Sequence, residues 1–135
     1  MLKDLKGNVK ATTSGGGIDG KDISGELVAH TSGGSIHFDD LACSLETSTS
    51  GGSINVTMKE LGQYVKISNS SGNIDLDLPK GKGLDLDLEA NRIKTDGLEN
   101  FSGTMKEDEI SGKINGGGVL VRVKAGSGRI NLGLK

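Results

Sequence analysis

The amino-acid sequence predicts an all-β fold, a β-solenoid whose three-sided coils each take about 18 residues. Three observations lead to this prediction: a Gly- and Ser-rich motif that recurs every 18 residues, alternation of apolar and polar residues on either side of it, and an excess of glycine. The chain has 135 residues, of which 23 are Gly and one is Pro. A chain of this length suits one domain, and we expect a single domain over residues 1–135.

The repeat is visible in five segments of similar sequence. The first three begin at Val9, Leu27 and Leu45, 18 residues apart; the fourth begins 20 residues later at Val65, and the fifth follows after 56 residues at Val121. They read VKATTSGGGIDG, LVAHTSGGSIHF, LETSTSGGSINV, VKISNSSGNIDL and VRVKAGSGRINL. A single such unit cannot bury its apolar face, whereas stacked units can.

Each repeat predicts two short strands with a corner between them, and then a third side. In the first repeat Val9, Ala11 and Thr13 alternate with polar residues, which is the period of a strand. The Ser-Gly-Gly that follows is a corner where positive φ costs little. Four columns of equivalent residues are expected to point inward. The first is a column of isoleucines, and the second contains the residues two positions later: Ile18, Ile36, Ile54, Ile74 and Ile130, then Phe38, Val56, Leu76 and Leu132, with Gly20 as an exception. The third lies on the third side (Leu5, Ile23, Leu41, Leu61), and the fourth consists of threonines that can hydrogen-bond along the stack (Thr13, Thr31, Thr49).

The period is interrupted in the second half of the chain. We expect regular coils over about residues 4–78, an irregular coil or loop insertion over about 79–108, and a closing coil over about 109–135. The runs 74–78 and 84–88 both read as alternating Leu and Asp around a Gly-rich turn. Such a pattern predicts either a hairpin or two successive sides of a coil, and the coils on both sides of it favour the second.

The aspartates of those two runs are the candidate site. If the runs lie side by side, Asp75, Asp77, Asp85 and Asp87 share one face, where several carboxylates could bind Ca²⁺ or another ligand. They would also be similar to the carboxylate ladders of β-helical enzymes that cleave polysaccharides. The simpler interpretation is a solvated outer face. No catalytic residue and no cofactor is predicted.

Composition argues against several other functions. The charge is −2 with 16 basic and 18 acidic residues interspersed, and the three aromatic residues are Phe38, Tyr64 and Phe101, so nucleic-acid binding is not expected. No apolar run approaches the length of a transmembrane segment. We expect no signal peptide, because the repeat begins within a few residues of Met1. His30, His37 and the lone Cys43 are interpreted as surface or chance residues, since a metal or nucleophile site needs more partners.

The repeated TSGGSI motif, the run LPKGKGLDLDLEANRI and the ending SGKINGGGVLVRVKAGSGRINL resemble a bacterial family of adhesin-like domains of unknown function. The resemblance covers nearly the whole chain. It implies a right-handed, single-stranded β-helix that is exported to the cell envelope or beyond, and it supplies no functional residues.

Three functions remain as expectations. The first is a non-enzymatic surface or periplasmic module that binds an unknown glycan or protein. The second is a polysaccharide-active enzyme on a β-helix. The third is a structural spacer that self-associates through the ends or edges of the stack.

Overall fold

The computed structural model describes residues 2–4, 6–79, 83–96 and 101–134, and in these ranges the chain is all-β. Within them no helix is long and apolar enough to cross a membrane. Thirteen strands form one sheet in the described part of the chain. They are β1 (Leu2–Lys3), β2 (Lys6–Thr13), β3 (Ile18–Lys21), β4 (Ser24–Thr31), β5 (Ile36–Thr49), β6 (Ile54–Asn69), β7 (Ile74–Leu78), β8 (Leu84–Glu89), β9 (Arg92–Asp96), β10 (Phe101–Met105), β11 (Glu109–Ile114), β12 (Val119–Ala125) and β13 (Arg129–Leu134).

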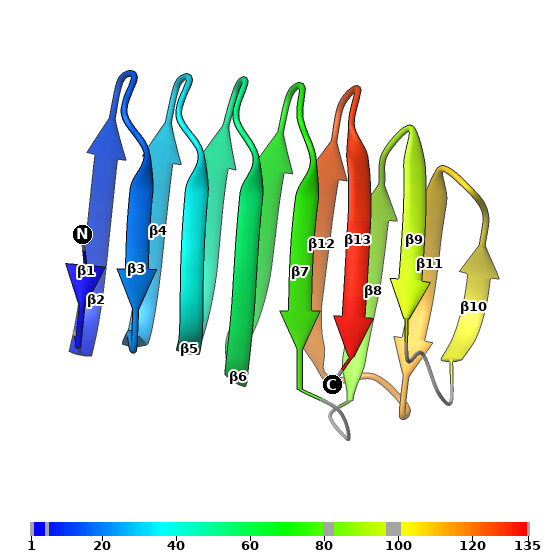
Figure 1. Cartoon of the computed structure of the whole chain (residues 1–135). Coiled ribbons are helices and arrows are strands. Elements are labelled where there is room, and N and C mark those ends of the chain that lie inside the picture. Colours follow the sequence, from blue (N-terminus) through cyan, green and yellow to red (C-terminus); the bar gives the residue numbers. More distant parts are fainter. Residues whose placement is uncertain (1, 5, 80–82, 97–100, 135) are drawn as a thin grey trace.

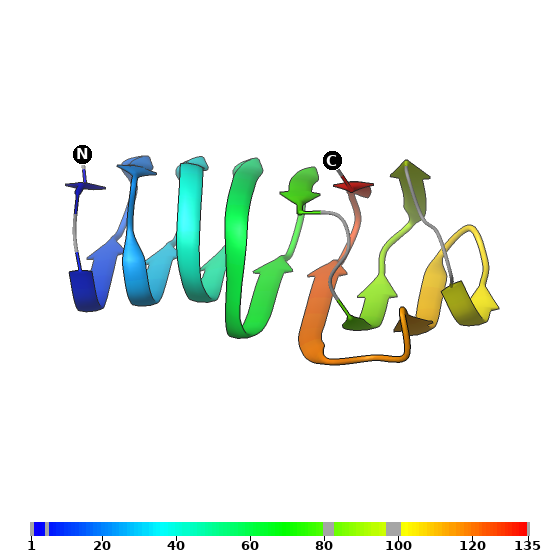
Figure 2. The ribbon, with the colours of Figure 1, turned by 90° about the horizontal axis from the view of Figure 1, so that it is seen from below.

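The sheet is strongly curled, so that its strands lie in two layers (Figures 1 and 2). The front layer of Figure 1 contains β1, β3, the first part of β5 and of β6, then β7, β13 and β9. The back layer contains β2, β4, the last part of β5 and of β6, then β12, β8, β11 and β10. All pairs are parallel except β8–β11 and β11–β10. Each passage of the chain through both layers is called a coil below.

The strand pairs confirm the 18-residue repeat of the first three coils. Val9 pairs with Leu27, and Leu27 pairs with Leu45. The next step, from Leu45 to Val65, is the 20-residue one, and the two extra residues are absorbed by register shifts between β5 and β6. Val65 therefore still pairs with Leu45, and both side chains point inward, although the repeat is longer.

The third-side column differs from the prediction in the fourth coil. Leu61 was expected beside Leu41, but Leu41 pairs with Met58, and Leu61 is in register with Cys43. Met58 and Leu41 are both buried. The reason is that the register shift falls within this short connection between the layers. Ile23 is buried as predicted, and Leu5 lies outside the described residues.

The core lies between the two layers. All five residues of the predicted Ile column are buried, as are Phe38, Val56, Leu76 and Leu132 behind them. Gly20, the exception in that column, gives room to its neighbour: a Cβ on Gly20 would lie 2.6 Å from Cδ1 of the Phe38 ring. Each fully buried aliphatic side chain contributes about 1.5–3 kcal/mol, so this column is a main source of stability.

The corners stack backbone on backbone. A Cβ on Gly34 would overlap the carbonyl oxygen of Gly16, and one on Gly52 would overlap that of Gly34. The same glycine carbonyls accept side-chain hydrogen bonds from the next coil. Thr31 Oγ1 donates to Gly16 O at 3.0 Å, Thr49 Oγ1 to Gly34 O at 3.0 Å, and Asn69 Nδ2 to Gly52 O at 2.6 Å. The polar column thus does hydrogen-bond along the stack, through the glycine corner.

The opposite corner depends on aspartate. Asp4, Asp22 and Asp40 have φ of 54°, 54° and 55°, a left-handed conformation that Asp tolerates better than most residues. Their backbone continues the stack, since Asp4 N donates to Lys21 O and Asp22 N to Asp39 O. This explains why an acid recurs before the third-side apolar residue.

The C-terminal segment does not lie at the end of the stack, where a closing coil was predicted over 109–135. β12 lies between β6 and β8, and β13 lies between β7 and β9 (Figure 1). β11 belongs to an antiparallel pair with β10 at the far edge. Because β12 is inserted between two strands, its inward residues have an apolar neighbour on each side. Val121 lies between Val65 and Leu86, and these three residues are buried. The last coil is therefore an internal one.

The glycine corner yields a direct prediction. Gly52→Ala should lower the free energy of unfolding by about 1–3 kcal/mol or more, because the new Cβ must displace the neighbouring backbone. Gly51→Ala is the matched control, since nothing lies within 4 Å of a Cβ there. Urea denaturation of both variants checks this, and equal midpoints would contradict it.

The polar column yields a second prediction. Thr49→Val keeps the shape of the buried side chain but leaves the Gly34 carbonyl without its side-chain donor. We expect a loss of about 1–3 kcal/mol, measured by thermal unfolding. Thr12→Val, at an exposed position of β2, should be close to neutral.

Candidate functional site

The structure separates the four aspartates of the predicted site. Asp75 and Asp77 lie on β7 in the front layer, whereas Asp85 and Asp87 lie on β8 in the back layer. Of the two arrangements open from the sequence, the runs 74–78 and 84–88 are therefore successive sides and not a hairpin. The apolar core lies between the two pairs, because Leu76 and Leu86 both point inward and are buried. The four carboxylates share no face.

The separated aspartates have different surroundings. Asp75 Oδ1 accepts a hydrogen bond from Asn131 Nδ2 at 2.7 Å. Asp87 Oδ2 lies 3.5 Å from Arg122 Nε, in a pair with roughly half-exposed side chains. Asp85 Oδ1 is buried and has no hydrogen-bond partner among the described residues. Within the described ranges no three His, Cys, Asp or Glu side chains come together as metal ligands would.

The two histidines lie on different layers. His30 Nδ1 is 2.5 Å from Ser48 Oγ in the back layer, and His37 Nε2 is 3.0 Å from Asp39 Oδ2 in the front layer. Sequence reasoning missed the first contact, although the 18-residue spacing of the two residues was a signal for it.

The outer surface of the back layer, here the back face, has a shallow groove of about 310 Å³. Two of its charged side chains are paired with acids: Arg122 Nε lies 3.5 Å from Asp87 Oδ2, and Lys124 Nζ lies 4.0 Å from Glu89 Oε2. Other residues that line it are His30, Glu46, Ser48 and Lys66. Such exposed pairs contribute little energy each.

The outer surface of the front layer, here the front face, carries outward residues in straight rows. Its middle row crosses six neighbouring parallel strands in register and is polar at every position. The row consists of Asp19, His37, Asn55, Asp75, Asn131 and Lys94. Neighbouring strands lie about 4.8 Å apart, so the row presents hydrogen-bonding groups at a regular spacing.

One position of the next row of the front face is hollow. Gly133 on β13 lies between Asp77 on β7 and Asp96 on β9, and it has no side chain to fill the row. A depression of about 430 Å³ is found there, lined by Asp75, Asp77, Lys94, Thr95, Asn131, Leu132 and Gly133. Asp75 and Asp77 were candidates from the sequence, but sequence reasoning missed Lys94, Asn131 and Gly133, because these come from strands that only the tertiary structure places beside β7.

These features define an all-β domain built from a repeated coil, with polar rows on its outer faces. The chain belongs to the Toastrack DUF4097 family, a family of domains of unknown function, whose model matches residues 3–133. No curated protein matches the chain. No solved structure matches it.

The separation of the aspartates has a measurable consequence. A Ca²⁺ site with ligand at 100 times its dissociation constant would add about 2.7 kcal/mol to the free energy of unfolding. We expect millimolar Ca²⁺ to leave the unfolding midpoint unchanged, because the four carboxylates lie in two layers. Calorimetric unfolding with Ca²⁺ and with EDTA checks this. The expectation would be contradicted if Ca²⁺ raised the unfolding midpoint of the parent protein but not that of Asp85→Asn.

Proposed function

We propose that this chain is a right-handed, single-stranded β-solenoid that serves as a non-enzymatic binding module of the cell envelope, and that its ligand is a polysaccharide held on the front face. The observation that carries the proposal is the middle row, six polar residues in register across β3, β5, β6, β7, β13 and β9. The adhesin-like resemblance of the repeat supports the localisation.

The form of the scaffold supports the solenoid part of the proposal. Strands β2, β4 and β5 pair in parallel at 18-residue offsets, and the chain passes from layer to layer between them (Figure 2). A connection between parallel neighbours of one sheet is right-handed in about 98% of cases. The buried Ile23 and Leu41 between the layers fit a short third side.

The chemistry of the front face supports a polysaccharide. Amide and carboxylate groups such as Asn55 and Asp75 can exchange hydrogen bonds with sugar hydroxyls, and they recur at strand spacing along the row. An extended polymer lying across the strands meets one such group per strand. Met105 on β10, the large apolar side chain most exposed among the described residues, belongs to the back layer. Apolar anchoring of a protein partner on the front face therefore has less support.

The enzymatic alternative has less support than a binding role. Cleavage of a glycosidic bond uses two carboxyl groups that flank the bond. The aspartate pairs of β7 and β8 lie on opposite faces, and the nearest partners of Asp75 and Asp87 are Asn131 and Arg122. The spacer alternative stays open to test, since β2 and β10 each pair on one side only.

The experiment compares binding of the intact chain to a panel of neutral and charged polysaccharides. His37→Ala/Asn55→Ala should weaken binding about 30-fold, because two hydrogen bonds are lost and each is worth roughly 1 kcal/mol. Lys10→Ala/Thr12→Ala, two exposed positions of the back face, is the matched control. Isothermal titration gives the affinities. A panel without any binder, or equal loss in both double variants, would refute the proposal.

A further inference from the structure

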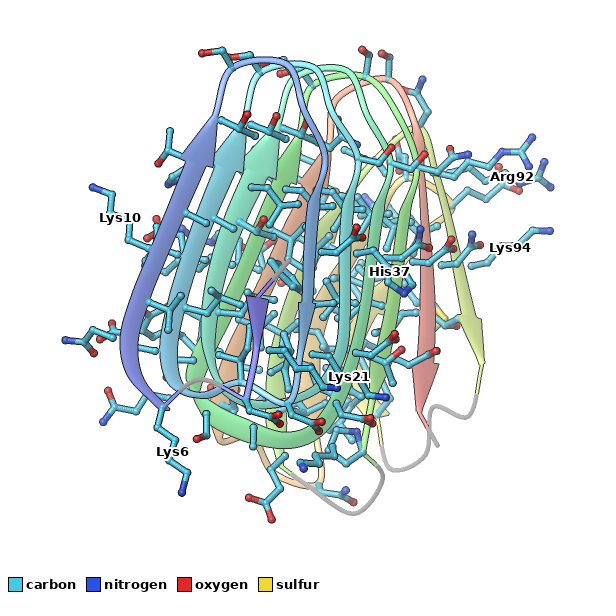
Figure 3. All side chains as sticks on the ribbon, turned by 60° about the vertical axis from the view of Figure 1, so that its left-hand side comes forward. Lys6, Lys10, Lys21, His37, Arg92 and Lys94 are labelled. Atoms are coloured by element: carbon cyan, nitrogen blue, oxygen red, sulfur yellow. The ribbon has the colours of Figure 1, made fainter. Side chains whose placement is uncertain are left out.

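Three cations gather at one corner of the front face. Arg129 on β13 and Arg92 on β9 are directly opposite each other, and Lys94 is two residues further along β9, opposite Asn131. All three side chains are exposed. Figure 3 shows Arg92 and Lys94 projecting from the same side, away from the sheet. These three residues are called the basic corner below.

The basic corner differs from three other cationic positions of the sheet, which are paired with acids. Arg122, Lys124 and Lys59 each lie within 4.0 Å of an acid, namely Asp87, Glu89 and Asp22. Among the described side chains no ion pair is made by Arg92, Lys94 or Arg129. The segment beside β9 includes Glu107, whose carbonyl accepts a hydrogen bond from Ile93 N at 2.7 Å, yet its carboxylate forms no ion pair with the corner.

The pairing of Arg92 with Arg129 works against stability. Like charges directly opposite on neighbouring strands destabilise the pair, and proteins tend to break such local rules where a function requires it. A ligand with anionic groups removes the repulsion when it binds. The guanidinium group is suited to this, because it holds sulfate, phosphate or carboxylate with two parallel hydrogen bonds.

The surroundings of the corner select among anionic ligands. The depression over Gly133 adjoins Lys94, and its other wall carries Asp75 and Asp77 on β7. These carboxylates repel a densely charged polymer, but they accept hydrogen bonds from hydroxyl groups. A polysaccharide that carries an anionic group on some of its sugar units can interact with both. Its anionic groups pair with the cations, and its hydroxyl groups donate hydrogen bonds to the aspartates. Nucleic acid fits less well, since the charge on its backbone is closely spaced.

We infer that Arg92, Lys94 and Arg129 bind the anionic groups of an acidic polysaccharide that lies along the front face. This inference rests on the proposed function and names the class of its ligand. The corner is the end of the middle row, so one polymer contacts the row through Asn131 and the corner through Lys94. Binding is electrostatic in part and weakens as salt rises.

The test uses the intact chain with four probes: heparin as a sulfated polysaccharide, polygalacturonate as a carboxylated one, dextran as a neutral one and a DNA duplex as a densely charged polymer. Arg92→Gln/Arg129→Gln should weaken binding of the charged probes at least about tenfold. Arg122→Gln/Lys124→Gln is the matched control, because it removes the same charge from the back face. Lys94→Gln alone should give a smaller loss. The unfolding midpoint of Arg92→Gln/Arg129→Gln should match that of the parent or exceed it, because the variant removes two like charges that lie opposite each other.

Several outcomes overturn the inference. These are equal loss in the two double variants, no binding of either charged probe, and tighter binding of a DNA duplex than of heparin at the same salt concentration. If dextran binds and only His37→Ala/Asn55→Ala weakens it, the proposed function stands and the basic corner has no part in it. If none of the polysaccharides binds, both proposals fall.

Discussion

The close contact of glycine backbones at one corner of the coil is the constraint on which the rest of the structure depends. At Gly34 and Gly52 the carbonyl of the preceding coil occupies the space that a Cβ would need. This contact sets the distance and register between coils, and the buried threonines satisfy the carbonyls it brings inside. The Ile column can then stack in a dry line between the layers. Hydrophobic burial supplies the energy, and the corner supplies the alignment.

Departures from the repeat are absorbed where the backbone is adaptable. The fourth coil takes two extra residues as register shifts between β5 and β6, away from the glycine corner. The C-terminal coil enters between earlier strands, and its Gly128 still stacks on Gly72. In both cases the inward columns stay intact, because a one-residue slip would turn the apolar side chains to solvent. Regularity is therefore kept in the core and relaxed in the connections.

The insertion of the last coil also makes the front face uneven. Without β13 the polar row of β3, β5, β6 and β7 would end at Asp75. With it, Asn131 engages Asp75, Gly133 opens a depression and Arg129 stands opposite Arg92. On the back face Arg122 and Lys124 are paired with acids on the neighbouring strand. The two faces share one scaffold, and the front one combines a regular row with a charged end.

The sequence alone determined the period of the first three coils, the inward Ile column and the glycine corner, because these follow from residues a fixed distance apart in the chain. It also indicated the all-β class. It did not reveal why Asp precedes each third side, which depends on the left-handed φ of Asp22 and Asp40. Only the tertiary structure decided that residues 119–134 lie inside the stack, that the aspartates of β7 and β8 lie apart, and that Arg92 meets Arg129. Strand order is set by burial on both sides of each strand, and that balance is not local in sequence.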